Sequence, residues 1–341
     1  MKYIKSLLVV LVISFTTIIT FSCFSQKENT QKINGLSFVA SRDTISNKHI
    51  APVKQVNASW TSIMPFGIMR SKDNPELFFN TERHWYGERY NGSKHSIELM
   101  HNNGIKVMLK PQIWIVKGEF TGELNMRTED DWRTFENNYE DMMLLYAKLA
   151  QETNAEMYCI GTELNSFVSR RPEFWKALIS KIKDIYKGEL TYAENWDKIE
   201  NVPFWKDLDY IGVDAYFPIS ETKTPLVEEV KQSWVTINKK LEHLSKTNNK
   251  PILFTEFGYR SIDFAGKTPW DARYVEGQVN EEAQLHLIQG LFESVWDKPW
   301  FSGGFLWKWF HNPEKLSARH DNRFCVHGKK AEPLLRDWYG L

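Results

Sequence analysis

The feature that most limits the fold is an alternation of short apolar runs with longer amphipathic ones, beginning near Gly35. Eight apolar runs have the length of strands: Leu36–Ala40, Trp60–Pro65, Lys106–Ile115, Glu156–Glu163, Glu189–Glu194, Tyr210–Ala215, Ile252–Glu256 and Gly303–Trp307. Between them, apolar residues recur every three or four positions, which is the period of a helix with one buried face. This period is found in residues 93–103, 131–150, 172–187, 226–245 and 281–296.

Strands that alternate with helices predict an α/β protein, here a single (β/α)8 TIM barrel spanning residues 35–341. A doubly wound open sheet is the alternative. It usually carries a Gly-rich first turn, and no GxGxxG follows the first predicted strand. In both folds ligands bind at the carboxyl ends of the strands. We therefore expect the functional residues where the predicted strands end.

The N-terminus predicts export. Lys2 and Lys5 precede an apolar run, and the small residue Ser22 stands directly before Cys23. Residues 1–22 thus predict a signal peptide, and Cys23 resembles the lipidated cysteine of a bacterial lipoprotein. Simple secretion and an uncleaved membrane anchor are the alternatives. Residues 23–34 would form a polar tether, and the lipid would be the protein's only membrane contact, at a cell surface or in the periplasm.

Composition and motifs exclude several classes of partner. Lys plus Arg and Asp plus Glu both total 43, and no basic run occurs, so nucleic acid binding is not expected. With Cys23 lipidated, Cys159 and Cys325 remain and predict no disulfide framework. The nine His form no HExxH motif and no cluster with Cys, so we expect neither a metal nor a cofactor. We expect a monomer.

Polar and aromatic side chains gather at the predicted strand ends. They are Lys110, Trp114, Glu163, Glu194, Asn195, Trp196, Asp214, Tyr216, Glu256, Trp307 and Lys308. A carboxylate at the end of a buried strand is costly unless it is paired, hydrogen-bonded or neutral. Each strand-end Glu therefore has two interpretations. It either forms a salt bridge with a neighbouring Lys or Arg, or it is a catalytic residue.

Glu163 and Glu256 follow the fourth and seventh predicted strands, which lets them face each other across the mouth of a barrel. Two carboxyls in different environments suit glycoside hydrolysis, in which one protonates the leaving oxygen and the other attacks the anomeric carbon. A charge on Glu256 would keep Glu163 protonated by like-charge repulsion. The pair therefore predicts a catalytic site. Glu194 also ends a strand, but we expect it beside the pair.

The order and spacing of these segments resemble clan A glycoside hydrolases, which carry Glu after strands four and seven. More specifically, the chain resembles glycoside hydrolase family 113, the β-mannanase-like barrels. The segments that carry the resemblance are GLSFVA, VMLKPQIWI, IGTELN, LDYIGVDAYFP, PILFTEFGYRS, GGFLWKW and GKKAEPLLRDWY, from about residue 35 to 340. Each string alone is weakly specific, but their order covers nearly the whole barrel region.

The resemblance implies a role for individual residues. Glu163 matches the acid/base and Glu256 the nucleophile of a retaining mechanism. Tyr216 matches a tyrosine that contacts the nucleophile, and Trp307 matches the tryptophan that floors the subsite where the bond breaks. One position departs from the clan, because Thr162 stands where most members place an Asn that binds the sugar 2-hydroxyl. That leaves open how this hydroxyl, which is axial in mannose, is held.

Other strand-end residues keep two interpretations each. Asn195 and Trp196 predict substrate contact or packing, and Lys110 either bonds sugar hydroxyls or pairs with a carboxylate. Asp214 is either a ligand group or an internal acceptor, and Trp114 is a platform for a sugar face or part of the core.

We expect a retaining hydrolase of β-1,4-linked mannan or glucomannan-type chains. The alternatives are another clan A specificity, such as a β-glucanase or transglycosylase, and a non-catalytic carbohydrate-binding barrel. A surface adhesion protein would not need the two convergent carboxylates.

Overall fold

The computed structural model describes residues 32–271, 278–312 and 322–341. Residues Lys32–Leu341 form one compact unit. The segment predicted as a signal peptide, with Cys23 and most of the tether, lies outside the described residues, so those interpretations stay predictions. Within the described part of the chain, no helix is both long enough and apolar enough to cross a membrane.

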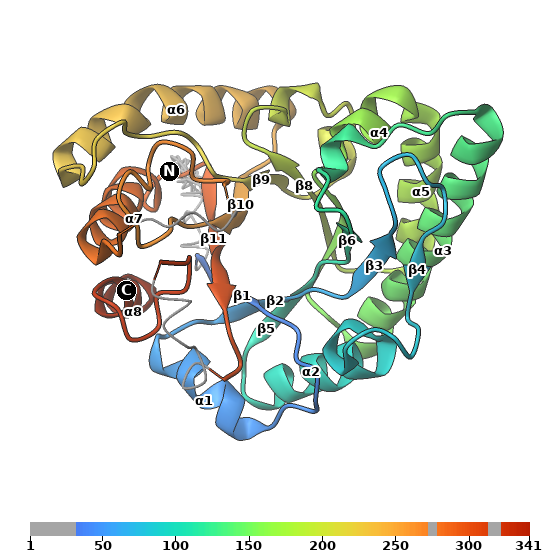
Figure 1. Ribbon diagram of the computed structural model, residues 1–341, viewed down its shortest axis with the longest axis horizontal. Coiled ribbons are helices and arrows are strands. Elements are labelled where there is room, and N and C mark those ends of the chain that lie inside the picture. Colours follow the sequence, from blue (N-terminus) through green and yellow to red (C-terminus); the bar gives the residue numbers. More distant parts are fainter. Residues whose placement is uncertain (1–31, 272–277, 313–321) are drawn as a thin grey trace, which may run out of the picture. The chain divides into compact units, whose positions relative to one another are not determined.

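Eight parallel strands close into a barrel in which each strand pairs with the next one along the chain (Figure 1). They are β1 (Ile33–Phe38), β2 (Trp60–Ile63), β5 (Lys106–Leu109), β7 (Met157–Thr162), β8 (Glu189–Asn195), β9 (Ile211–Asp214), β10 (Ile252–Phe257) and β11 (Phe301–Trp309). Each predicted strand run overlaps one of them, and the predicted TIM barrel is confirmed. In barrel order β7 is the fourth strand and β10 the seventh.

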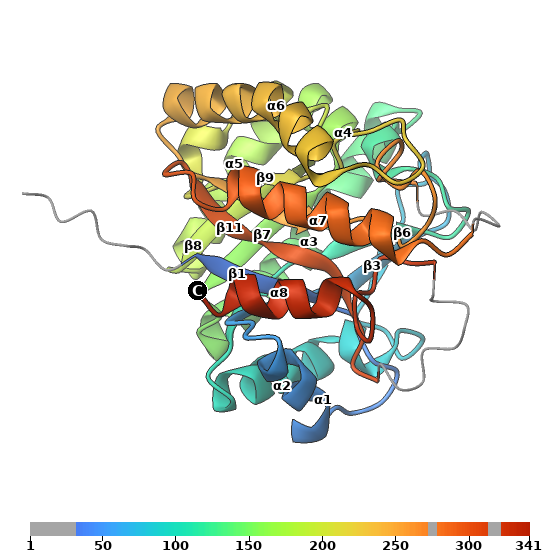
Figure 2. The same ribbon diagram turned by 90° about the vertical axis from the view of Figure 1, so that its left-hand side faces the viewer.

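Helices surround the ring of strands (Figures 1 and 2). They are α1 (Asn47–Gln55), α2 (Tyr90–Asn102), α3 (Glu129–Thr153), α4 (Asn165–Arg170), α5 (Pro172–Ile185), α6 (Val227–Asn248), α7 (Glu281–Val295) and α8 (Ala331–Tyr339). Short 3-10 helices are η1 (Tyr86–Glu88), η2 (Thr121–Glu123), η3 (Ile199–Asn201) and η4 (Trp205–Asp207). The five helices predicted from periodicity are all present. The sequence reading missed α1, α4 and α8.

Two apolar layers hold the barrel together. Seven different barrel strands contribute to a small buried cluster in the interior, made of Ile33, Trp60, Met108, Met157, Cys159, Ala193, Leu253 and Phe305. A much larger cluster lies between the strands and the helices, and it buries many of the aromatic residues. The interior is thus packed, which leaves the rims of the barrel for chemistry. Cys159 is fully buried, as a small packing residue would be.

The prediction of one continuous strand over Lys106–Ile115 is wrong. The chain forms β5, breaks at Lys110 and Pro111, and resumes as β6 (Gln112–Ile115). Proline has no backbone N–H to donate to a ladder, so a strand that contains it tends to end there. β6 leaves the barrel and joins β3 (Phe66–Met69) and β4 (Phe78–Phe79) in a separate three-stranded sheet. Figure 2 shows β3 and β6 toward one end of the barrel.

The barrel also begins earlier than predicted. β1 starts at Ile33 and pairs with β11 from that residue onward, whereas the tether was expected to run to Asn34. Both residues are buried, so the ladder with β11 and the packing of Ile33 extend the strand over a segment whose own pattern is ambiguous.

Candidate active site

Glu256 lies near the end of β10 and is nearly buried, with 7% of its surface exposed. Three side chains donate hydrogen bonds to its carboxyl group. Lys110 Nζ and Gln112 Nε2 donate to Oε1 at 2.6 and 3.1 Å, and Tyr216 Oη donates to Oε2 at 2.8 Å. Hydrogen bonds from a cation and two neutral donors stabilise a negative charge. A carboxylate is tolerated at this buried position because both of its oxygens accept hydrogen bonds.

A buried ion network lies beside Glu256. Lys110 and Asp214 are fully buried, and Lys110 Nζ lies 3.4 Å from Asp214 Oδ1, which also accepts a hydrogen bond from Thr255 Oγ1 at 2.7 Å. Burial opposes the charge on Lys110, but the carboxylates of Asp214 and Glu256 outweigh it and raise the pKa of Lys110. Burial and the charge of Glu256 raise the pKa of Asp214. Lys110 therefore pairs with a carboxylate, and Asp214 is an internal hydrogen-bond acceptor, which are two of the alternatives that the sequence left open.

Glu163 follows β7 directly and has a left-handed backbone, with φ of 52°. Its amide donates to the Ala193 carbonyl at 2.7 Å, and its carbonyl accepts from Thr121 Oγ1 at 3.3 Å. Such a backbone conformation is uncommon for a residue with a side chain and often occurs at functional sites. The backbone on both sides of Glu163 is therefore held, which orients a side chain that is itself only partly buried.

The carboxyl group of Glu163 is in an opposite environment from that of Glu256. Among the described residues, none donates a hydrogen bond to it. Burial raises the pKa of Glu163 well above its usual range, and the nearby charges of Asp214 and Glu256 raise it further. The structure thus brings the two predicted glutamates close enough for the charge of Glu256 to act on Glu163. The Glu256 carboxyl accepts hydrogen bonds from three donors, whereas the pKa of Glu163 is raised.

Gln112 was not predicted as a site residue. It follows the break at Pro111, and its side chain turns back to Glu256. A signal was present, because Lys110 and Gln112 are two positions apart in an extended segment, and alternation places such residues on one face. Tyr216, which the family resemblance linked to the nucleophile, makes that contact.

Glu194 is buried near the end of β8, and its hydrogen bonds go to neighbouring residues outside this network. Its Oε2 accepts from Tyr192 Oη at 3.1 Å, and its Oε1 accepts from the Asn195 amide at 2.9 Å. Burial raises the pKa of Glu194 to about 7. As the sequence predicted, Glu194 lies beside Glu163 and Glu256, but its hydrogen bonds are with residues close to it in the sequence.

We expect Glu194→Gln to change how stability depends on pH. The pKa of Glu194 is about 7 in the folded state, compared with 4.5 as its ordinary value. The wild-type protein should therefore lose stability as pH rises from 4.5 to 7, by up to about 3 kcal/mol. The glutamine variant should show a flatter dependence, measured as the free energy of unfolding in urea at several pH values. Identical slopes for both proteins would contradict the buried, proton-binding role.

The remaining predicted side chains lie around the mouth of the barrel. Asn195 Oδ1 accepts from the Trp196 amide at 3.0 Å, so this oxygen is used internally. Trp196 is half-buried and packs against the rings of Phe217 and Trp270, each with centroids 5.6 Å away. Trp270, between β10 and α7, was missed because a single tryptophan in a loop carries no periodic signal.

Trp307 is half-buried near the end of β11, as a residue that lines a cleft would be. The ammonium group of Lys308 lies 5.2 Å from the centroid of the Trp307 ring and 5.5 Å from that of Phe310. Burial lowers the pKa of Lys308, and the charge of Glu256 opposes that effect. The end of β11 therefore contributes an aromatic face and a cation near Glu256.

In the described part of the chain, the exposed Phe and Trp side chains lie toward one end of the barrel. Among the described residues, the exposed Phe and Trp side chains all lie in segments that lead from a barrel strand to the next helix: Phe78, Trp85, Trp114, Phe120, Phe264 and Trp270. The segments that lead from helices back to strands have none in the described ranges. Exposed apolar side chains that gather in one region often mark a ligand-binding surface. Their location therefore points to ligand binding at the end that holds Glu163 and Glu256.

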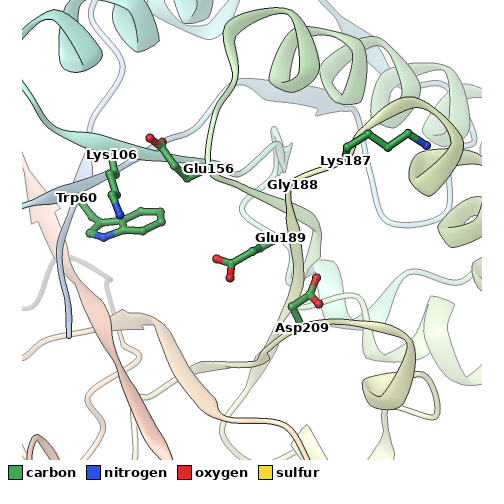
Figure 3. A pocket seen from close by; sticks show the side chains of 7 residues that line it. All are labelled: Trp60, Lys106, Glu156, Lys187, Gly188, Glu189 and Asp209. Atoms are coloured by element: carbon green, nitrogen blue, oxygen red, sulfur yellow. The ribbon is translucent and has the colours of Figure 1, made fainter. Parts of the chain in front are cut away.

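A hollow at the opposite end has a different character. Figure 3 shows the residues that line it: Trp60, Lys106, Glu156, Lys187, Gly188, Glu189 and Asp209. Three of them are the first residues of β2, β5 and β8, so the hollow lies at the amino ends of the strands. Active sites of TIM barrels lie at the other end. In the described ranges, no group of three or more His, Cys, Asp and Glu is arranged to hold a metal ion.

Comparison with known proteins agrees with this geometry. The model of Glycoside Hydrolase Family 113 matches residues 39–329. The chain is similar to a solved β-mannanase of that family from Alicyclobacillus acidocaldarius, with 26% identity, a TM-score of 0.76, and coverage of 92% of this chain and 98% of the other. No curated protein matches.

Two further solved structures show the fold alone, because their identity is low. A family 113 β-1,4-mannanase is 23% identical with a TM-score of 0.79, covering 91% of this chain and 99% of the other. A β-glucuronidase from Ruminococcus gnavus is 13% identical with a TM-score of 0.58, covering 86% and 46%. Since the family model spans most of the sequence and the two strand-end glutamates converge, the chain belongs to glycoside hydrolase family 113 and is a glycoside hydrolase.

Proposed function

We propose that the protein is a retaining β-glycoside hydrolase that cleaves β-1,4-linked mannan or glucomannan-type chains by double displacement. The observation that carries this proposal is the contrast between the two carboxyl groups. Glu256 accepts three hydrogen bonds, one of them from a lysine, whereas the pKa of Glu163 is raised by burial and neighbouring charge. Two titratable groups whose environments favour different protonation states are suited to act as nucleophile and acid.

In the first step, a carboxylate oxygen of Glu256 attacks the anomeric carbon and forms a glycosyl ester. The bond from that carbon to the glycosidic oxygen breaks, and Glu163 donates its proton to the leaving oxygen. Lys110, Gln112 and Tyr216 are positioning residues, because their hydrogen bonds fix the orientation of the Glu256 carboxylate.

In the second step, water attacks the anomeric carbon and displaces Glu256. Glu163 is now an anion and takes the proton from that water. Esterification removes the negative charge of Glu256, which is one of the charges that raise the pKa of Glu163. The pKa of Glu163 should therefore fall in the intermediate, which suits its change from acid to base.

The substrate assignment is supported by the family and by the aromatic residues at the rim. The solved family 113 enzyme from Alicyclobacillus acidocaldarius is a β-mannanase. Trp307, Trp196 and Trp114 are at least partly exposed at this end of the barrel, and aromatic faces pack against the apolar faces of sugar rings. We propose these three, with Asn195, as substrate contacts.

Product analysis tests this proposal. The enzyme is incubated with mannan, glucan and xylan oligomers, products are sized, and the anomer formed first is identified by proton NMR. We expect mannan oligomers to be cleaved fastest and the first reducing sugar to be the β-anomer. Faster cleavage of glucan would establish another clan A specificity, and an α-anomer would contradict double displacement. Binding without turnover would establish a non-catalytic barrel.

A further inference from the structure

The small sheet of β4, β3 and β6 has two unlike faces. One face packs against the protein and carries Gly67, Met69, Phe79, Ile113 and Ile115. Contact on this side is tight, because a Cβ at Gly67 would lie 2.6 Å from the sulfur of Met142 on α3. The sheet is therefore anchored to the barrel through this face, and the opposite face is turned outward.

The outward face carries apolar and aromatic side chains. Ile68 pairs with Trp114 on β6 and with Phe78 on β4, and Phe66 pairs with Gln112. Trp114 is 58% exposed and Phe78 is 41% exposed, while Phe66 and Ile68 are half-buried. Paired residues in neighbouring strands point to the same side of a sheet. We call Phe66, Ile68, Phe78 and Trp114 the β6 platform.

The β6 platform is continuous with the catalytic site. Gln112, which donates a hydrogen bond to Glu256, is two residues before Trp114 on β6, so both side chains lie on the same face of the strand. That spacing corresponds to about 6.6 Å along the strand. The ring of Phe66 meets that of Trp114 edge-on, with centroids 6.4 Å apart. An apolar surface thus extends outward from the residue that contacts the nucleophile.

We infer that the β6 platform is a distal sugar-binding subsite, occupied by units of the same polysaccharide chain beyond those at the point of cleavage. This inference rests on the proposed function. A substrate that reaches Glu256 and continues past Gln112 passes over the platform. A binding surface for a separate partner would not need to adjoin the nucleophile. The Arg70 guanidinium lies 5.8 Å from the centroid of the Phe78 ring and supplies hydrogen-bond donors for sugar hydroxyls at its outer edge.

A distal subsite makes the enzyme favour long substrates. Short oligomers fill only the positions around the glutamates, whereas longer ones also cover Trp114 and Phe78. Each aromatic contact should contribute a factor of about five to ten in kcat/KM for the long substrate. The structure therefore assigns to the platform a preference for polymer over short oligosaccharide.

The test compares mannotriose with mannohexaose as substrates for Trp114→Ala and Phe78→Ala. We expect each substitution to lower the hexaose-to-triose ratio of kcat/KM by about five- to tenfold. Trp114→Phe keeps an aromatic face and should retain most of the ratio. The matched control is Val235→Ala, which shortens an exposed apolar side chain on the outer helix α6 and should leave the ratio unchanged.

Two results would overturn the inference, and they are distinguishable. If the platform variants keep the wild-type ratio while the wild-type enzyme cleaves both oligomers, the β6 platform is not a subsite and the proposed function stands. If the wild-type enzyme cleaves neither oligomer, the proposed function fails, and the platform fails with it as a mannan subsite. Thermal unfolding of each variant confirms that the fold is intact.

Discussion

Replacing Glu256 with alanine should abolish turnover of mannan oligomers, lowering kcat by about 10⁴- to 10⁶-fold, the range seen when a nucleophile is removed from other hydrolases. The physical reason is that no other described carboxylate has the same position, held between Lys110, Gln112 and Tyr216. Without it the glycosyl ester does not form. Initial rates of reducing-sugar release measure the effect.

Added azide should restore activity to the Glu256→Ala variant. The small anion enters the space left by the side chain and attacks the anomeric carbon from the same side as the carboxylate did. The product is a glycosyl azide of inverted configuration, which NMR identifies. Glu194→Gln is the matched control, because Glu194 is another buried strand-end glutamate whose hydrogen bonds go to Tyr192 and the Asn195 amide instead of Glu256, and it should keep near wild-type rates. Wild-type activity in Glu256→Ala would remove this residue from the mechanism.

Replacing Glu163 with glutamine should lower kcat on mannan oligomers by about 10²- to 10⁴-fold, the usual contribution of general acid–base catalysis. A sugar hydroxyl is a poor leaving group without a proton donor. In an aryl glycoside with an acidic phenol, the phenolate leaves without protonation. The rate of the first step on such substrates should therefore fall much less. Pre-steady-state release of the phenol distinguishes the two steps. Equal losses on both kinds of substrate would contradict an acid role for Glu163.

The pH profile provides a second readout for Glu163. Its pKa is raised by burial and by the charges of Asp214 and Glu256, so the protonated acid persists to higher pH than for an ordinary glutamic acid. Wild-type kcat/KM should fall as pH rises through this raised pKa, because the proton donor is lost. The Glu163→Gln variant cannot titrate there and should lose that alkaline decline. An unchanged alkaline limb in the variant would assign it to another group.

The barrel and its catalytic pair were predictable because their signals are local. Strand and helix periods are properties of short windows, and eight strand-length runs in alternation with helices leave few folds. Counting strands then places Glu163 after the fourth and Glu256 in the seventh, which the closed barrel confirms. Because the carboxyl ends of parallel strands lie at the same end of the barrel, residues at those ends are expected to lie close together.

The environment of each glutamate was not predictable in the same way. Lys110 lies 146 positions from Glu256, and neither residue's local pattern distinguishes an ion pair from a sugar contact. The break at Pro111 turns β6 out of the barrel, and only its pairing with β3 shows which residues of that strand share a face with Gln112 and Trp114. Trp270 is recognised as a site residue only by its contact with Trp196, which is distant from it in the sequence.

The order of apolar and amphipathic segments by itself determined the (β/α)8 architecture and the strand ends on which Glu163 and Glu256 lie. Only the tertiary structure decided which carboxyl group accepts hydrogen bonds from three donors and which has its pKa raised by burial and neighbouring charge. The reason is physical, since a pattern along the chain is set by neighbours in sequence, whereas hydrogen bonds, burial and charge depend on residues that folding brings from distant strands.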